Sequence, residues 1–302
     1  MGKIAFVFAG QGDQFPGMGK ELCERYEEAA RVFTLCDRIR PGTSTQCFYG
    51  SEEDLKDTAN TQPCLFAMEL AAAGVLKANG IVPDAVAGFS LGEVAACTFA
   101  GVFTPEQGFR LVTARGALMK EACGNAPYFM AAVLRLGRAQ VLEICRQVKG
   151  VYAVNYNCPG QITVSGNMAQ MNLLKEKVNE AGGRMIPLRV SGAFHSPFMK
   201  QAAGKFMEIL KDNPIKKPDV AVYSNVNGLP YSDDIRALLS RQIASPVLWE
   251  DTITNMIRQG TDTFIEVGPG NSLIGMIRRI DKTVRTYTVS DLPKVLQEVK
   301  AC

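Results

Sequence analysis

The fold is indicated most clearly by the stretch Ala85-Val86-Ala87-Gly88-Phe89-Ser90-Leu91-Gly92-Glu93. Its first four residues are small and apolar, which is typical of a short buried strand, and a helix is expected to begin near Leu91. Gly88 to Gly92 matches the pattern G-x-S-x-G, in which a tight strand-to-helix turn exposes a serine nucleophile. The alternative is a glycine-rich packing turn in which Ser90 only caps the helix. The position between a strand and a helix favours the nucleophile.

His195 is the only histidine of the chain, so a reaction that needs an imidazole base at neutral pH has one candidate. It lies in Gly192-Ala193-Phe194-His195-Ser196, a predicted loop between a strand and a helix, where functional residues often lie. A lone histidine is more commonly a surface or packing residue, but a serine nucleophile needs a base within hydrogen-bonding reach. No Asp or Glu near either residue is an obvious third member of a triad. A backbone carbonyl could orient the imidazole instead.

A glycine-rich loop, Gly10 to Gly19, follows the first predicted strand. Gln11 and the neighbouring backbone amides could face the serine, as the early loop of serine hydrolases does, which makes Gln11 a candidate for an oxyanion hole. The amide of Leu91, at a helix N-terminus, would be the second donor. The alternatives are a simple tight turn or a phosphate-binding loop. The loop lacks the Lys-Ser/Thr of a P-loop and a clean G-x-G-x-x-G.

Arg115 stands in the otherwise apolar helical stretch Thr113-Ala114-Arg115-Gly116-Ala117-Leu118-Met119. A guanidinium on an apolar face is costly to bury unless it meets an anion. The alternatives are an arginine whose charge reaches the surface and an internal ion pair. Without further information those alternatives are favoured.

The middle of the chain predicts a small unit of its own. Its pattern is strand, helix, strand, strand, helix, strand, which is the split βαβ of a ferredoxin-like unit. These elements are expected at 128–136, 137–148, 151–157, 160–166, 167–181 and 184–190. We therefore assign residues 125–191 to an inserted subdomain, and residues 1–124 and 192–302 to a larger α/β domain.

The larger domain is predicted to alternate strands with helices. Strands are expected at 3–8, 85–88 and 263–267, and helices at 19–33, from Leu91, from Thr104-Pro105 to about 123, and at 271–280. A further long helix is expected to be capped by Thr61, opened by Pro63 and continued through Leu76 to end near Gly80.

Composition excludes several classes of protein. The 302 residues include 33 Lys plus Arg and 30 Asp plus Glu, and the net charge of +3 is too small to indicate nucleic-acid binding. It leaves room for a local basic patch that could receive an acidic partner. The nine cysteines are scattered without a C-x-x-C motif, which favours a reducing, cytoplasmic compartment. No apolar run approaches the roughly 20 residues of a membrane span.

Taken together, these residues resemble the malonyl-CoA:acyl carrier protein transacylase family of type II fatty-acid synthases and the acyltransferase domains of polyketide synthases. The resemblance covers essentially the whole chain and implies a hydrolase-like α/β large domain with a parallel central sheet and an inserted ferredoxin-like βαββαβ subdomain. The segments that carry it are, in order, Gly10-Gln11-Gly12, Gly17-Met18-Gly19, Thr61-Gln62-Pro63, Gly88 to Glu93, Arg115-Gly116, Asn157-x-Pro159-Gly160-Gln161, Gly192 to Ser196, Gln242 before Ser245-Pro246-Val247-x-Trp249, and Val267 to Gly270.

The resemblance implies catalytic roles for five residues. Ser90 would be the acylated nucleophile and His195 the general base, oriented by the main-chain carbonyl of Gln242. Gln11 and the amide of Leu91 would form the oxyanion hole.

It also implies a substrate pocket. Arg115 would bind the free carboxylate of malonyl through two hydrogen bonds, and Gln62 and Asn157 would support the pocket. The Gly-Ala-Phe-His segment is similar to the version that accompanies malonyl rather than methylmalonyl units, with Phe194 crowding the α-carbon. Phe89 departs from the family, which usually has His in G-H-S-L-G. The base lies elsewhere, so this change puts the acyl preference and the lifetime of the acyl-enzyme in question.

The activity implied is ping-pong transfer of malonyl from malonyl-CoA to the phosphopantetheine thiol of an acidic holo acyl carrier protein. No cofactor or metal, no nucleic acid and no membrane is implied, and we expect a cytoplasmic monomer. A serine esterase or thioesterase would share the nucleophile and base but would not need Arg115. A catalytically weak carrier-protein-binding module is the non-enzyme alternative, and only Phe89 motivates it.

Overall fold

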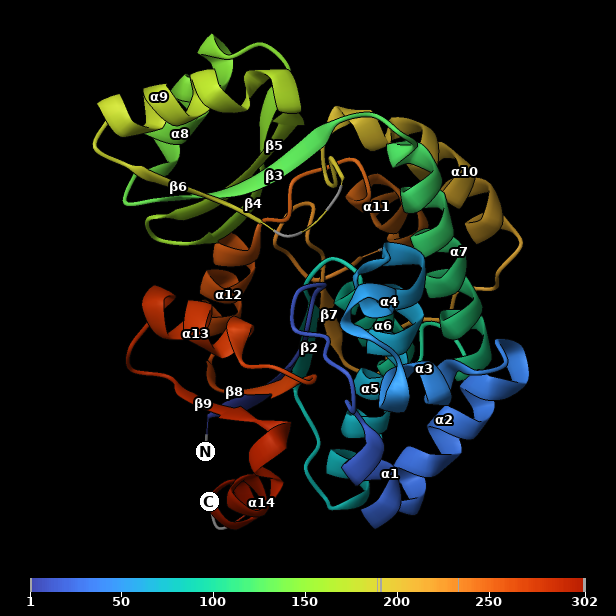
Figure 1. The fold of residues 1–302 in the computed structure, drawn as a ribbon. Coiled ribbons are helices and arrows are strands. Elements are labelled where there is room, and N and C mark those ends of the chain that lie inside the picture. Colours follow the sequence, from blue (N-terminus) through green and yellow to red (C-terminus); the bar gives the residue numbers. More distant parts are fainter. Residues whose placement is uncertain (1, 189, 191, 233, 301–302) are drawn as a thin grey trace.

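The computed structural model describes residues 2–188, 190, 192–232 and 234–300 (Figure 1). Its larger part is built on a parallel sheet, which within the described residues has five strands in the order β7-β2-β1-β8-β9. The strands are β1 (Lys3–Phe8), β2 (Ala85–Gly88), β7 (Ala221–Tyr223), β8 (Thr261–Val267) and β9 (Arg285–Thr288). The expected α/β class with a parallel central sheet is confirmed.

A second, antiparallel sheet lies above the first in Figure 1. Its order, β4-β5-β3-β6, places β5 between β3 and β4, as the split βαβ of a ferredoxin-like unit requires. The elements are β3 (Tyr128–Leu134), α8 (Arg138–Gln147), β4 (Val151–Cys158), β5 (Gln161–Asn167), α9 (Met171–Glu180) and β6 (Arg184–Pro187). The boundaries at 124/125 and 191/192 remain predictions, and residue 191 lies outside the described residues.

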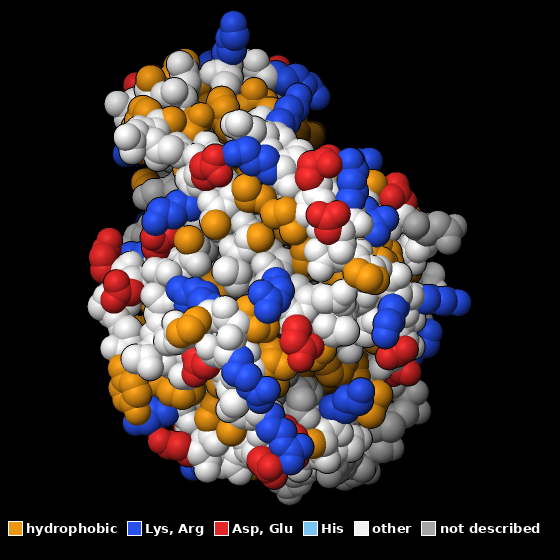
Figure 2. Space-filling model, turned by 90° about the vertical axis from the view of Figure 1, so that its right-hand side faces the viewer, with side chains coloured by type: hydrophobic (Ala, Val, Ile, Leu, Met, Phe, Trp, Pro, Cys, Tyr) orange, Lys and Arg blue, Asp and Glu red, His pale blue; other side chains and the backbone are white. Residues whose placement is uncertain are grey.

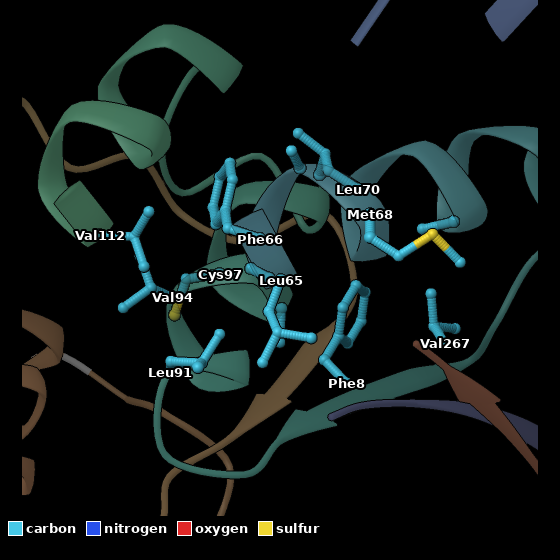
Figure 3. Close-up of a cluster of buried hydrophobic side chains, with 14 of the residues drawn as sticks. Phe8, Leu65, Phe66, Met68, Leu70, Leu91, Val94, Cys97, Val112 and Val267 are labelled. Atoms are coloured by element: carbon cyan, nitrogen blue, oxygen red, sulfur yellow. The ribbon is translucent and has the colours of Figure 1, made fainter. Parts of the chain in front are cut away.

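Alternation along β1 explains why helices cover both faces of the parallel sheet. Phe6 and Phe8 pack into the core formed with α5 (Thr58–Ala78), α6 (Gly92–Phe99) and α7 (Pro105–Cys123). Ala5 and Val7 point the other way, toward α12 (Trp249–Arg258) and α13 (Ser272–Ile280). Figure 3 shows the first of these cores, with Leu65 and Phe66 of α5 above Phe8. Two apolar faces therefore fix the sheet between two helical layers.

Helix α5 begins earlier than expected. Asp57 is its cap, accepting from the amide of Ala59, whereas the Thr61 hydroxyl donates to the carbonyls of Leu55 and Asp57. Pro63 lies inside the helix and does not open it. The prediction of a start at Thr61 is wrong because Asp57 offers a carboxylate acceptor one turn earlier. Within the described part of the chain, no helix is both long and apolar enough to cross a membrane.

The predicted helix 19–33 is also interrupted. It divides into α1 (Lys20–Arg25) and α2 (Glu27–Ile39) because Tyr26 is extended, with φ −132° and ψ 121°. The predicted strand 184–190 ends at Pro187 as β6, and residue 189 lies outside the described residues. The remaining elements are α3 (Thr43–Tyr49), α4 (Glu52–Lys56), η1 (Met168–Gln170), η2 (Pro197–Met199), α10 (Lys200–Lys211), α11 (Ile235–Gln242), η3 (Val289–Asp291) and α14 (Leu292–Lys300).

The surface carries charges of both signs. On the face seen in Figure 2, Lys and Arg side chains are interspersed with Asp and Glu side chains rather than gathered into a patch of one sign. Exposed pairs such as Lys205–Glu121 and Lys211–Glu208 join neighbouring residues of opposite charge. Such pairs contribute little to stability.

Candidate active site

Ser90 stands at the turn between β2 and α6, and its backbone has a φ of 55°. Left-handed backbone is unfavourable for a residue with a side chain, so the surrounding contacts must hold it. The two flanking glycines allow the close approach of strand and helix. A Cβ on Gly88 would lie 1.9 Å from the carbonyl carbon of Gly92, and one on Gly92 would lie 2.4 Å from the Phe8 oxygen. The G-x-S-x-G spacing thus follows from packing as well as from chemistry.

The structure brings Ser90 and His195 together. Ser90 Oγ lies 2.7 Å from His195 Nε2, and His195 Nδ1 lies 2.9 Å from the main-chain oxygen of Gln242. A carbonyl oxygen only accepts, so Nδ1 carries the proton and Nε2 is free to accept from the serine hydroxyl. Within the described residues no carboxylate contacts the imidazole.

Burial governs the charge of His195. It lowers the pKa of the imidazole from 6.5 to about 4, and the charge of Arg115 acts in the same direction. The ring is therefore neutral at pH 7, as a general base must be. His195 also has a φ of 60°, so both members of the pair have left-handed backbone.

Arg115 is fully buried on α7 and bonds only to neutral groups. Nη1 donates to Gln62 Oε1 at 2.6 Å, and Nη2 donates to Gln242 Oε1 at 2.7 Å and to Ser90 Oγ at 3.1 Å. Its Nε has no partner, and no carboxylate in the described part of the chain lies within ion-pair distance. Within the described residues, Arg115 is therefore neither a surface arginine nor a member of an ion pair, the two alternatives considered for it. An unneutralised guanidinium beside the nucleophile suits an anionic ligand.

A cavity of about 80 Å³ joins these groups. Both parts of the molecule contribute to its wall, because Met130 of β3 and Asn155 of β4 come from the antiparallel sheet, whereas Arg115 comes from α7 of the larger part. The lining residues are Gln11, Gln62, Phe89, Ser90, Leu91, Arg115, Met119, Met130, Asn155, Leu188, Val190, Phe194 and His195. An adjoining cavity of about 480 Å³ shares Gln11 and Phe194 with it.

The predicted oxyanion donors both line this cavity. The amide of Ser90 donates to Asn225 Oδ1 at 2.8 Å, whereas the amide of Leu91 has no acceptor among the described residues. Gln11 Oε1 accepts from the hydroxyl of Thr58 at 2.9 Å, which fixes the oxygen and leaves the side-chain nitrogen as the available donor. A free amide at a helix N-terminus is suited to a developing negative charge.

Of two further predicted pocket residues, Phe89 lines the cavity and Asn157 does not. Phe89 packs its ring edge-on against Trp249, with centroids 5.5 Å apart, and still reaches the cavity. Asn157 does not line the cavity. Its amide nitrogen donates to Thr163 at 3.2 Å, and Asn155, which we did not predict, lines the cavity instead.

The sequence also did not indicate which side chains brace the turn: Asn225 was not predicted, and Gln242 was predicted only for its main-chain carbonyl. Asn225 accepts from the Ser90 amide and donates through Nδ2 to the Gly88 oxygen at 2.6 Å. The side chain of Gln242 donates to the Ser90 oxygen at 2.6 Å. One signal was available for Asn225, because it follows β7, the strand beside β2, and carboxyl ends of adjacent parallel strands lie together.

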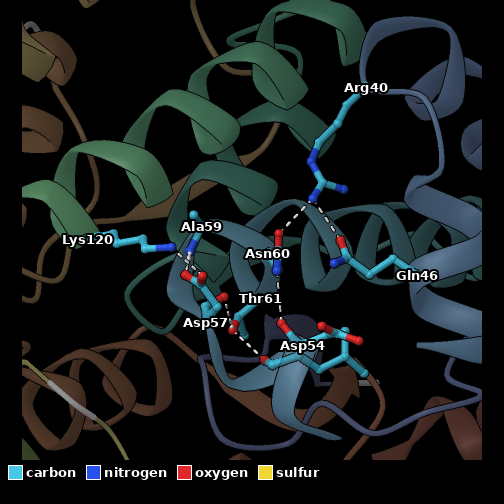
Figure 4. A network of polar contacts seen from close by, with 9 residues as sticks. Arg40, Gln46, Asp54, Asp57, Ala59, Asn60, Thr61 and Lys120 are labelled. Carbon is cyan, nitrogen blue, oxygen red and sulfur yellow. Dashed lines mark hydrogen bonds and ion pairs between the residues drawn. The ribbon is translucent and has the colours of Figure 1, made fainter. Parts of the chain in front are cut away.

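The N-terminus of α5, which carries Thr58 and Gln62, is fixed by an outer polar network (Figure 4). Lys120 of α7 bonds Asp57 at 2.5 Å, and Arg40 donates to Asn60 at 2.8 Å. The inner Arg115–Gln62 contact and the outer Lys120–Asp57 pair therefore join the same two helices.

Comparison with known proteins agrees with this geometry. Residues 5–296 match the family described as acyl transferase domain. The chain is 40% identical to the malonyl CoA-acyl carrier protein transacylase of Bacillus subtilis, covering 96% of this chain and 94% of that protein. It is 35% identical to the Staphylococcus aureus (strain MSSA476) protein of the same name, with 98% of each covered.

Solved structures give the same result. The Clostridium perfringens malonyl CoA-acyl carrier protein transacylase superposes with a TM-score of 0.96 at 38% identity, covering 99% of this chain and 98% of that one. A malonyl-transacylase solved in complex with a type II PKS acyl carrier protein gives 0.95 at 31% identity, covering 99% and 100%. The chain therefore belongs to the acyl transferase family and, within it, to the malonyl CoA-acyl carrier protein transacylases.

Proposed function

We propose that this protein moves the malonyl group of malonyl-CoA to the phosphopantetheine thiol of an acyl carrier protein through a malonyl ester on Ser90. The observation that carries the proposal is the position of Arg115. Its guanidinium is buried, lacks a carboxylate partner among the described residues and donates to the Ser90 hydroxyl at 3.1 Å. An acyl group that carries its own carboxylate would neutralise this charge at the point where acylation occurs.

In the first half of the reaction, His195 Nε2 takes the proton of the Ser90 hydroxyl as Oγ attacks the thioester carbonyl. The oxyanion receives hydrogen bonds from the Leu91 amide and the Gln11 side chain. The tetrahedral intermediate then breaks its carbon–sulfur bond, and the coenzyme A thiolate takes the proton from His195. The Gln242 carbonyl holds the imidazolium through Nδ1 while it exists.

The second half reverses these steps with a new thiol. The carrier thiol gives its proton to His195 Nε2 and attacks the ester carbonyl, after which Ser90 Oγ leaves and recovers the proton. Because the first product departs before the second substrate binds, the kinetics are ping-pong.

The cavity restricts which acyl group can be carried. About 80 Å³ accommodates a short chain, and Phe194 lies on the wall of this cavity. We infer that its ring would crowd an α-methyl group. Such a contact discriminates by about 1–3 kcal/mol, which favours malonyl over methylmalonyl. Gln62 supports the pocket by accepting from Arg115, while Asn155 is better placed than Asn157 to contact the acyl group.

The setting of the activity is also part of the proposal. We propose that the protein is a cytoplasmic monomer and that its partner is an acidic carrier protein. Cysteines in the described part of the chain are free thiols, which supports a reducing compartment.

The test is incubation with malonyl-CoA followed by peptide mass spectrometry. A malonyl ester on Ser90 is expected, it should be absent from Ser90→Ala, and a holo carrier protein should remove it as malonyl-carrier thioester. Label on a cysteine, or label retained by Ser90→Ala, would refute the nucleophile. Release to water at the same rate with and without the carrier would favour the thioesterase.

A further inference from the structure

Glu93 is a buried carboxylate that takes no part in the steps above, yet it contacts the residues that hold the site. It lies in the first turn of α6, three residues after Ser90, and is fully buried. Oε2 accepts from Gln242 Nε2 at 2.7 Å, and Oε1 accepts from the Asn225 amide at 3.2 Å and from the Tyr231 hydroxyl. All three partners are placed as donors, which is the arrangement that suits an ionised carboxylate.

Gln242 links this carboxylate to Arg115. Its Oε1 accepts from Arg115 Nη2 at 2.7 Å, and its Nε2 donates to Glu93 and to the Ser90 oxygen. A side-chain amide can also lie the other way round, with oxygen and nitrogen exchanged. That orientation would set Nε2 against the Arg115 donor and Oε1 against two acceptors. Glu93 and the Ser90 carbonyl thus together select the orientation in which Gln242 receives Arg115.

Gln242 also keeps the two charges apart. Burial raises the pKa of Glu93 from 4.5 to about 7 and lowers the pKa of Arg115 from 12.5 to about 10, and the charge of each residue opposes the shift of the other. Among the described residues the two form no ion pair. A direct pair would occupy the guanidinium that the incoming carboxylate needs. With one glutamine between them, Glu93 offsets part of the charge while the Nε of Arg115 remains without a partner.

We propose that Glu93 is a positioning residue that acts through Gln242 on Arg115 and so sets the preference for acyl groups that bear a carboxylate. The inference rests on the proposed function, because it concerns the same pocket. Acyl groups without a carboxylate do not bind Arg115. Their transfer therefore depends on Glu93 only because Gln242, which Glu93 holds, also braces the Ser90 turn.

The test is Glu93→Gln, which keeps the size of the side chain and removes its charge. In one orientation the new amide turns its oxygen toward Gln242, and its nitrogen then faces the donors of Asn225 and Tyr231. In the other orientation its nitrogen faces Gln242 Nε2, so Gln242 has to flip and set its own nitrogen against the Arg115 donor. We expect malonyl transfer to fall by about tenfold or more, mainly through a higher KM, because small displacements of positioning groups are costly. Acetyl transfer should fall by less than about threefold, so the malonyl-to-acetyl ratio of kcat/KM drops.

Glu266→Gln is the matched control. Glu266 is as buried as Glu93 and accepts from the amides of Leu273 and Ile274, away from the acyl cavity. This variant should leave the malonyl-to-acetyl ratio unchanged. Circular dichroism and thermal unfolding of both variants show whether they are folded.

The inference is overturned if Glu93→Gln keeps the wild-type ratio or loses both activities equally. Should Glu93→Gln not fold, Tyr231→Phe removes one donor from the same carboxylate and should lower the ratio in the same direction, and an unchanged ratio there also overturns it. A wild-type protein that transfers neither acyl group would instead refute the proposed function.

Discussion

At two junctions of the parallel sheet, a strand is followed by a short turn and a helix. In one of them the first helix amides donate to a carboxylate, and in the other the amide of Leu91 is left free within the described part of the chain. After β8, the turn Gly268-Pro269-Gly270 leads into α13, whose amides at Leu273 and Ile274 donate to Glu266 at 3.1 and 3.0 Å. After β2, the turn at Ser90 leads into α6, where the Leu91 amide has no acceptor among the described residues. Glu93 turns away from the helix amides and bonds Gln242.

The difference shows how one supersecondary unit can serve structure or chemistry. A carboxylate on the strand that accepts from the amides of the following helix neutralises the helix terminus, and the junction is then complete without a ligand. At Ser90 the terminus is left for an oxyanion, and the carboxylate is used elsewhere. If the two junctions are separable in this way, changes at the Ser90 junction should alter acyl transfer, and changes at Glu266 should alter stability alone.

The largest effect is expected for His195, the general base beside the Ser90 junction. His195→Ala should lower malonyl transfer by about 10² to 10⁴-fold, because general base catalysis contributes that much. Steady-state transfer to a holo carrier protein measures it. A variant that retains the wild-type rate would show that the Ser90–His195 contact is not the catalytic one.

The pH profile of the wild-type protein gives a second view of the same base. Since the pKa of His195 is lowered to about 4, the imidazole stays neutral well below its ordinary value of 6.5. The acid limb of kcat/KM for acylation by acetyl-CoA, whose acyl group does not use Arg115, should therefore lie below pH 6. A limb at the ordinary histidine value would mean that His195 is less buried in solution.

Arg115→Ala should have the next largest effect, and it should be selective. Truncation of one partner of a sheltered charge pair costs on the order of 2–5 kcal/mol, so malonyl transfer should fall by a factor of roughly 30 to several thousand. Acetyl transfer should be little changed or improved, because an unneutralised guanidinium is removed. Comparison of kcat/KM for the two acyl groups decides it, and equal losses would contradict the role of Arg115.

At the junction between β8 and α13, where Glu266 occupies the helix amides, the expected effect is on stability alone. Burial raises the pKa of Glu266 from 4.5 to about 7. The folded protein then holds this proton where the unfolded chain has released it, so the contribution of Glu266 to stability falls as pH rises from about 4.5 to 7. The free energy of unfolding of the wild type, measured by urea titration and taken relative to Glu266→Gln, should therefore fall across that range. A difference that is independent of pH would show that Glu266 is not shifted.

Phe89→His should have the smallest effect. The acyl-enzyme should still form, because Ser90 and His195 are unchanged, and the malonyl-to-acetyl ratio or the rate of hydrolysis should shift by a few-fold through the added polar group. Burst acylation and steady-state transfer are compared for both proteins. If only Phe89→His formed an acyl-enzyme, the carrier-binding alternative would gain support.

Sequence reasoning was most successful where residue type and local spacing carry the information. The Ser90 turn, the parallel sheet and the βαββαβ order depend on glycines and on apolar periodicity, and the fold class is confirmed. Ser90 and His195 were also selected correctly as neighbours, whereas only the family resemblance placed Arg115 beside them, and the catalytic roles of all three stay predictions. For the serine and the histidine, the chemistry of the residue already demanded a partner.

The remaining features depend on distant pairing. Asn225 and Gln242 lie more than 130 residues after the groups they brace, so no local pattern brings them to the turn. The choice between Asn155 and Asn157 depends on irregular register in β4, which shifts between Ala153 and Asn155 and again between Tyr156 and Cys158. A bulge changes which face a side chain occupies, and alternation along the sequence does not predict it.

The left-handed backbone at Ser90 and His195 has a consequence for evolution and engineering. A residue with a side chain in this conformation costs roughly 1–2 kcal/mol, a penalty that glycine avoids. Substitution of either residue by glycine would relieve that strain while removing the nucleophile or the base. Variants chosen only for thermal tolerance would therefore tend to discard the dyad, and any library built to stabilise this protein has to be selected for acyl transfer at the same time.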